Sequence, residues 1–211
     1  MRDNGLLRWE LSIVCVTDRP GSFGADMGND TVRAAQLQRA IAVDGYRHAG
    51  EVSLWNALYP EDDSMCVGAY PGGVLICHAD LAGALIHGNA WSRVNRSLRP
   101  DFRDTVLHLF PGGEVMSLAL HCVTSLWGFS AYRAARRIRT VAGSAEDGVF
   151  VNSGVPLSEE VPVLARATPA MLDLPAAGED LVLAASARMF GSRIDLLRGT
   201  GPVLSHYRLK K

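Results

Sequence analysis

Three runs of apolar residues between residues 114 and 143 limit the fold more than any other feature of the chain. They occupy residues 114–123, 126–134 and 137–143, and the connections between them are very short. Short connections join antiparallel neighbours, whereas a parallel pair of strands needs a crossover of about a dozen residues or more. We therefore predict that the three form an antiparallel meander.

The rest of the chain mixes strands and helices without a regular βαβ alternation. Runs rich in β-branched and apolar residues, bounded by turn sequences, predict further strands over residues 9–17, 65–69, 74–78 and 149–152. Capping residues such as Asp30 and Gly191 help to predict helices over residues 31–43, 79–87, 101–110 and 177–190. Residues 51–59 fit either a short helix or irregular packing. The predicted class is α+β, a mainly antiparallel sheet with three to four helices packed against it.

The length and charge of the chain restrict its class. Its 211 residues suit a single α+β domain, with a core over about residues 8–191 and a C-terminal extension over residues 192–211. A formal net charge of −1 provides no general attraction to nucleic acid, so we do not expect a nucleic-acid partner. The sequence has neither a signal peptide nor an apolar run of about 18 residues, which predicts a cytoplasmic protein without a membrane span.

His121 and Cys122 are neighbours in the first strand of the meander and raise the question of a catalytic pair. Successive strand side chains point to opposite faces, so Cys122 shares an apolar row with Leu118 and Leu120. His121 shares the other face with Ala119. A base and a nucleophile need direct hydrogen-bond reach, which this geometry denies them. We predict an inert core thiol at Cys122 and favour a structural histidine at position 121, whose small neighbours still leave space for a site.

The cysteines of the predicted hairpin face one another. A turn centred on Pro71 and Gly72 pairs residues whose numbers add to 143, which places Cys66 opposite Cys77. A disulfide between them needs a non-hydrogen-bonded pair and an oxidising compartment, so two packed free thiols are favoured. None of the four cysteines has the spacing of a zinc site, and we expect neither a metal nor another cofactor.

Six side chains are candidates for a functional site: His121, Asp18, Glu159 and Glu160 for catalysis, and Tyr70 and Trp127 for ligand binding. Each has a structural alternative, namely a turn for Asp18, a solvated exit from the sheet for the two glutamates, and the core for the aromatic rings. The loop "GSFGADMG" is not a phosphate-binding motif. The arginines of "RAARRIR" are predicted to lie on a solvated face of the sheet.

Three segments occur in a recognisable order: "YPGGVLIC", "LALHCVTSLWGFSAY" and "DGVFVNSGVPLSEE". They contain a Pro-Gly turn followed by Cys77, a strand bearing His121, an aromatic strand with Trp127, and a G-x-P-L segment before Glu159 and Glu160. This order resembles a family of small, uncharacterised bacterial proteins, found notably in actinobacteria and known only as a domain of unknown function. The resemblance covers roughly residues 10–191. It implies a single domain of shared architecture and supplies no activity, ligand or catalytic residue.

The leading hypothesis is a non-catalytic cytoplasmic domain that binds a protein partner or a ligand, or that forms a homo-oligomer. It follows from the lack of a nucleophile–base pair, of metal spacing and of a phosphate loop in the sequence. It predicts an exposed apolar or acidic patch. The alternative is a small hydrolase or transferase with a site around His121 and Asp18, which predicts that His121 and the acidic candidates line one concave pocket.

Overall fold

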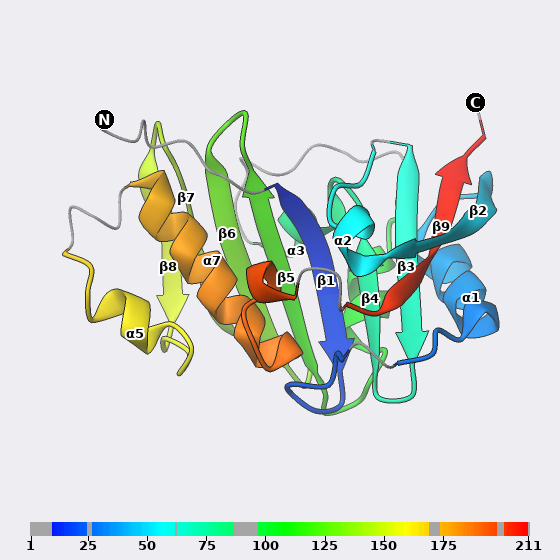
Figure 1. Cartoon of the computed structure of the whole chain (residues 1–211), viewed down its shortest axis with the longest axis horizontal. Coiled ribbons are helices and arrows are strands. Elements are labelled where there is room, and N and C mark those ends of the chain that lie inside the picture. Colours follow the sequence, from blue (N-terminus) through cyan, green and yellow to red (C-terminus); the bar gives the residue numbers. More distant parts are fainter. Residues whose placement is uncertain are drawn as a thin grey trace.

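A computed structural model describes residues 10–24, 27–61, 63–86, 97–168, 174–197 and 201–210. One nine-stranded sheet runs through these ranges in the order β2-β9-β3-β4-β1-β5-β6-β7-β8 (Figure 1). Every neighbouring pair of strands is antiparallel. The strands are β1 Leu11–Thr17, β2 Tyr46–Ser53, β3 Ser64–Tyr70, β4 Gly73–Cys77, β5 Glu114–His121, β6 Leu126–Arg133, β7 Arg136–Ser144, β8 Gly148–Gly154 and β9 Val203–Leu209.

The described ranges also contain six α-helices and one 3₁₀ helix. They are α1 Thr31–Ile41, α2 Leu54–Ala57, α3 Leu81–Leu85, α4 Phe102–Leu107, α5 Val161–Leu164, α7 Pro175–Phe190 and the 3₁₀ helix η2 Ile194–Leu196. The mainly antiparallel sheet with helices against it is as predicted, but the helices outnumber the three to four expected and the sheet is larger. No helix in these ranges is both long and apolar enough to cross a membrane.

Local sequence patterns predicted the meander and the hairpin of the sheet correctly. The predicted meander is β5, β6 and β7, and the predicted hairpin is β3 and β4, in which Cys66 pairs with Cys77. The carboxylate of Asp30 caps α1 by accepting a hydrogen bond of 3.0 Å from the backbone N–H of Arg33. Gly191 ends α7 in the left-handed conformation, with φ of 74°, as its lack of a Cβ permits.

Two strands, β2 and β9, were not predicted. The C-terminal extension expected over residues 192–211 is wrong, because β9 lies inside the sheet between β2 and β3. Leu204 of β9 is fully buried. The sequence of β9, "VLSHYRL", carries polar residues among its apolar ones and pairs with strands far away in the chain. Neither feature produces a strong local strand pattern.

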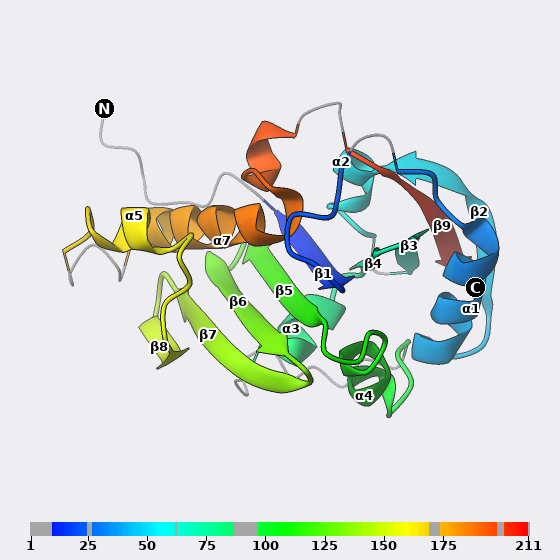
Figure 2. The ribbon, with the colours of Figure 1, turned by 90° about the horizontal axis from the view of Figure 1, so that it is seen from below.

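Both faces of the sheet are buried. Met116, Leu118 and Leu120 of β5 belong to an apolar cluster with α7, α2 and α5 on one face, while Val115 and Ala119 belong to a second cluster with α1, α3 and α4 on the other. Figure 2 shows these two sets of helices on opposite sides of the strands. The alternation predicted for this strand is confirmed. Burial on both faces also explains the continuous apolar run of β1.

Candidate functional site

A groove of about 590 Å³ lies at the end of the sheet where β1 begins and β5 ends. Apolar side chains from the turn after α2 and from the β5–β6 turn form much of its wall. Among the described residues, three carboxylates and a histidine also line it. The residues on which the argument depends are Glu10, Glu61, Asp80 and His121 among the polar ones, and Leu58, Tyr59, Val123 and Leu126 among the apolar ones.

Antiparallel pairing brings these distant segments together. Leu11 pairs with Leu120, so Glu10 before β1 and His121 at the end of β5 arrive at the same end of the sheet. Ile13 pairs with Cys77, which delivers Asp80, three residues after β4, to the same place. The groove therefore forms where one strand starts and two neighbouring strands finish.

His121 is exposed and held by its own turn. Its Nδ1 accepts a hydrogen bond of 3.3 Å from the backbone N–H of Thr124 and lies 2.9 Å from the Oγ1 of the same residue. Ser125, with φ of 48°, closes the turn in the left-handed region. Since Nδ1 accepts, the proton of the neutral ring is on Nε2. His121 thus contributes an N–H donor of fixed orientation to the groove wall.

The structure does not bring His121 and Asp18 together. Asp18 follows the last residue of β1, whereas His121 lies beside the first, so about 20 Å of strand separates them. The backbone N–H of Asp18 donates to the carbonyl of Gly72 at 3.1 Å, and its carboxylate lies 3.8 Å from Nε of Arg19. Asp18 is a turn residue at the other end of the sheet.

The two consecutive glutamates have different surroundings, and neither lines the groove. Glu160 is completely buried and forms an ion pair with Arg139 of β7, at 2.7 Å between Oε2 and Nη2. The predicted solvated exit is therefore wrong for Glu160, as is the predicted solvated position of Arg139. Glu159 is one-fifth exposed and lies 3.5 Å from Nη1 of Arg188.

Both aromatic candidates are core residues. Trp127 is fully buried, and Gly178 of α7 lies so close to its indole that a Cβ at that position would come within 2.1 Å of the ring. Tyr70 is also buried, and its hydroxyl donates to the carbonyl of Val203 at 2.8 Å. Neither ring presents a face to solvent on which a ligand could stack.

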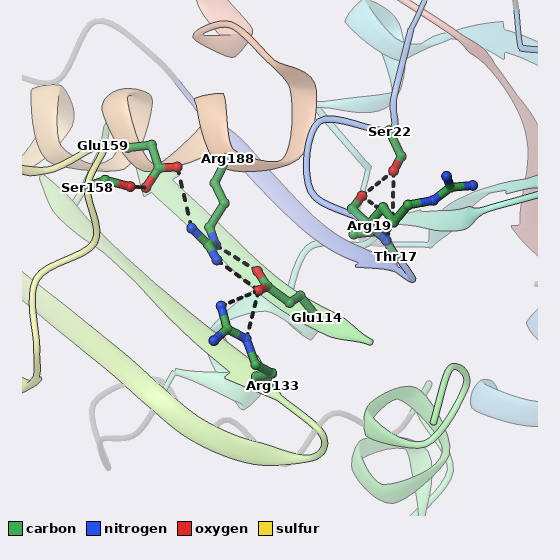
Figure 3. Close-up of polar contacts among 8 residues, drawn as sticks. All are labelled: Thr17, Arg19, Ser22, Glu114, Arg133, Ser158, Glu159 and Arg188. Atoms are coloured by element: carbon green, nitrogen blue, oxygen red, sulfur yellow. Dashed lines mark hydrogen bonds and ion pairs between the residues drawn. The ribbon is translucent and has the colours of Figure 1, made fainter. Parts of the chain in front are cut away.

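The opposite end of the sheet carries a charged cluster around Glu114, the first residue of β5 (Figure 3). Its carboxylate accepts hydrogen bonds from Arg188 of α7 at 2.6 and 2.8 Å and from Arg133 of β6 at 2.7 and 2.9 Å. Burial by itself raises the pKa of Glu114, but the two guanidinium groups outweigh burial and the net shift is downward. These hydrogen bonds link α7 to the sheet.

Sequence reasoning missed a serine–histidine pair formed by Ser97 and His78. The Oγ of Ser97 lies 3.0 Å from Nε2 of the completely buried His78. The Nδ1 of His78 accepts a hydrogen bond from the backbone N–H of Asp80 at 3.2 Å, so Nε2 of the neutral ring carries the proton. That nitrogen cannot remove a proton from Ser97, as a catalytic base must. No local sequence pattern indicates this pair, because Ser97 reaches His78 through the tertiary structure, where its neighbour Leu98 forms an isolated β-bridge with Ala42.

Within the described ranges, no group of three or more His, Cys, Asp or Glu residues is arranged to hold a metal ion. No curated protein and no solved structure matches the chain. The model of one protein family, a family of unknown function, matches residues 11–205. The match includes every described strand except the last residues of β9, and it begins one residue after Glu10.

Proposed function

The chain belongs to this family of unknown function, DUF6928, and from its groove we propose that it is a non-catalytic domain that binds a ligand with an apolar body and a cationic group. The observation that carries the proposal is the composition of the groove wall. Glu10, Glu61 and Asp80 line it together with apolar side chains. Carboxylates attract a cation, and burial of a hydrocarbon body against the apolar walls is energetically favourable.

The size and exposure of the groove support a binding role. Its volume of about 590 Å³ is in the range of ligand pockets in proteins. Val123 is 83% exposed and Tyr59 is 42% exposed, and both line the groove. Apolar side chains exposed beside a concavity are typical of surfaces that are covered by a ligand or a partner.

The surroundings of the histidines favour binding over catalysis. In the part of the chain that the structure describes, the hydrogen bonds to His121 come from Thr124, and no carboxylate orients the ring. His78 carries its proton on the nitrogen that faces Ser97 and is completely buried. We therefore rank the hydrolase or transferase below the binding domain.

We extend the proposal to the setting of the protein. We propose a cytoplasmic location, and the resemblance noted above supports a bacterial, actinobacterial origin. The ligand is a small molecule or an exposed side chain of a protein partner, since both offer an apolar cation of this size. We also propose that the chain can form a homo-oligomer, and the geometry of the groove is compatible with either state.

The test is a titration followed by NMR with matched probes, 4-phenylbutylamine and the uncharged 4-phenylbutan-1-ol. We expect the amine to shift the amide resonances of Val123 and Thr124, and to bind about tenfold more tightly than the alcohol. Added salt should weaken the binding of the amine and not that of the alcohol, because exposed charges are screened. Equal affinities for amine and alcohol, or shifts confined to other surfaces, would reject the proposal.

A control variant separates local from general charge. Glu146 lies in the β7–β8 turn, is exposed, and does not line the groove. Glu146→Gln removes the same charge as a groove substitution, and it should leave the affinity for the amine within about twofold.

A further inference from the structure

Three carboxylates among the described residues line the groove, but they are not equivalent, and we infer that Glu10 is the residue that binds the cationic group of the ligand. The inference rests on the proposed function and adds to it the chemical class of the ligand. That class is a cation with N–H donors, either a primary ammonium or a guanidinium. It follows from which carboxylates already have partners and from what those partners are.

Glu61 already has a cationic partner. The Nη2 of Arg208 lies 2.7 Å from one of its carboxylate oxygens and 2.9 Å from the other. A ligand cation at Glu61 would compete with this guanidinium, and little net attraction would be left. Asp80 sits in the turn between β4 and α3, where its backbone N–H is bonded to His78, and it makes further interactions of its own.

Glu10 has a different kind of partner. The Sγ of Cys122 lies 3.6 Å from its Oε2, and in the described ranges Glu10 forms no ion pair. A thiol is a weak and uncharged donor, so the negative charge of Glu10 is oriented but not neutralised. A charged N–H donor bonds to a carboxylate more strongly than a thiol does. A ligand cation therefore gains an interaction at Glu10 without displacing another cation.

Cys122 acts as a positioning residue for this carboxylate. Burial and the neighbouring Glu10 raise the pKa of the Cys122 thiol, which keeps it protonated at neutral pH. The thiol can then donate to Oε2, while the thiolate would repel Glu10. The carboxylate of Glu10, the residue before β1, is in this way held in place at the groove, and its second oxygen, Oε1, remains for the ligand.

Hydrogen bonding defines the chemical class. A primary ammonium carries three N–H donors and a guanidinium five, so both can bond to a carboxylate whose other oxygen is occupied. A quaternary ammonium has the same charge but no donor. It would depend on aromatic faces, and among the described residues that line the groove only Tyr59 is a Phe, Tyr or Trp. The inference therefore predicts discrimination between cations of equal charge.

The experiment compares Glu10→Gln with Glu61→Gln, using 4-phenylbutylamine, its N,N,N-trimethyl derivative and 4-phenylbutan-1-ol. With the unchanged protein, we expect the amine to bind at least about tenfold more tightly than the trimethyl compound. Glu10→Gln should remove that difference and leave binding of the alcohol unaltered, which also shows that the groove is intact. Glu61→Gln should keep the preference for the amine.

Two further results have defined meanings. Loss of amine binding in Glu61→Gln but not in Glu10→Gln overturns the assignment to Glu10 while the proposed function stands. Failure of all three probes to bind the unchanged protein rejects the proposed function itself.

The role of Cys122 has its own test. Cys122→Ala should lower the affinity for the amine a few-fold, and Cys122→Ser should restore that affinity, since a hydroxyl also donates to Oε2. If the serine variant is as weak as the alanine variant, the positioning role of Cys122 is wrong.

Discussion

Arg139 of β7 and Glu160, the residue before α5, form an ion pair whose side chains are 2% and 0% exposed. Two guanidinium nitrogens bond to the carboxylate, with Nη2 at 2.7 Å from Oε2 and Nε at 2.9 Å from Oε1. The backbone N–H of Leu157 donates to the same carboxylate at 2.7 Å. This pair fixes the segment that leaves β8, because it ties the chain before α5 to a strand inside the sheet.

Removing one partner of this pair should be costly. Glu160→Ala leaves a buried guanidinium without its counterion, so we expect the free energy of unfolding to fall by about 3–5 kcal/mol. Glu159→Ala is the matched control, because the contact of Glu159 with Arg188 is long, at 3.5 Å, and partly exposed, and is therefore worth no more than about 1 kcal/mol. Urea unfolding followed by tryptophan fluorescence measures both values. Similar losses for the two variants would mean that the buried pair does not stabilise the fold as described.

The same pair illustrates what the sequence can predict. Glu159 and Glu160 are identical residues at adjacent positions, and no local pattern distinguishes the buried one from the exposed one. The register of Cys66 with Cys77, in contrast, followed from a turn and simple alternation, both of which are local. β2 and β9 lie more than 150 residues apart and pair with each other, so only the tertiary structure reveals them.

The composition of the groove, like the pairing of β2 with β9, depends on tertiary structure. His121 drew attention through its residue type, but Glu10 did not, since an acid before a strand is an ordinary feature. The groove joins the start of β1, the end of β5 and the turns after α2 and β4. Their proximity depends on strand order, and strand order was not readable from the sequence. Residue chemistry could therefore suggest one member of the site and not its composition.

A glycine in the β6–β7 turn should increase the stability of the protein. Ala134 and Ala135 both have positive φ, 48° and 59°, in a region that L residues with a Cβ disfavour. Ala134 is exposed, so Ala134→Gly removes strain without removing core contacts. We expect the free energy of unfolding to rise by about 0.5–1 kcal/mol. The same substitution in a helix, Ala187→Gly in α7, should lower it by about 1 kcal/mol. A loss of stability in both variants would contradict the strain argument.

Glu114 should make the stability depend on pH under acidic conditions. Burial alone raises its pKa, but the hydrogen bonds and charges of Arg188 and Arg133 lower it overall. A carboxyl group with a lowered pKa in the folded state stabilises the protein above the pKa of the unfolded chain, about 4.3. This stabilisation is lost as the pH falls through the lower, folded-state pKa. In urea unfolding from pH 7 to pH 2.5, Glu114→Gln should therefore differ most from the unchanged protein near neutrality and progressively less in acid. A difference independent of pH would show that the charge of Glu114 does not contribute.

The four cysteines should differ sharply in reactivity. Cys15, Cys66 and Cys77 are buried, while Cys122 is partly exposed. Burial raises the pKa of Cys66 to about 12 and that of Cys77 well above its ordinary value. Only the thiolate attacks disulfide reagents, so the three buried thiols are protected both by packing and by their protonation. Cys122 also has a raised pKa, but reagent can reach it, so the folded protein should react with Ellman's reagent slowly and at one thiol.

Pairing in the hairpin also opposes a disulfide between Cys66 and Cys77. Tyr70 and Gly73 flank the turn as a hydrogen-bonded pair, and alternate pairs outward from them have the same character. Cys66 and Cys77 therefore form a hydrogen-bonded pair, in which the Cα atoms are about 5.5 Å apart and the side chains diverge more than in the other kind. After denaturation without reductant, all four thiols should react. Cys122→Ser should abolish the reaction of the folded protein and leave three thiols in the denatured one. Two missing thiols after denaturation would instead reveal the cross-strand disulfide that this geometry disfavours.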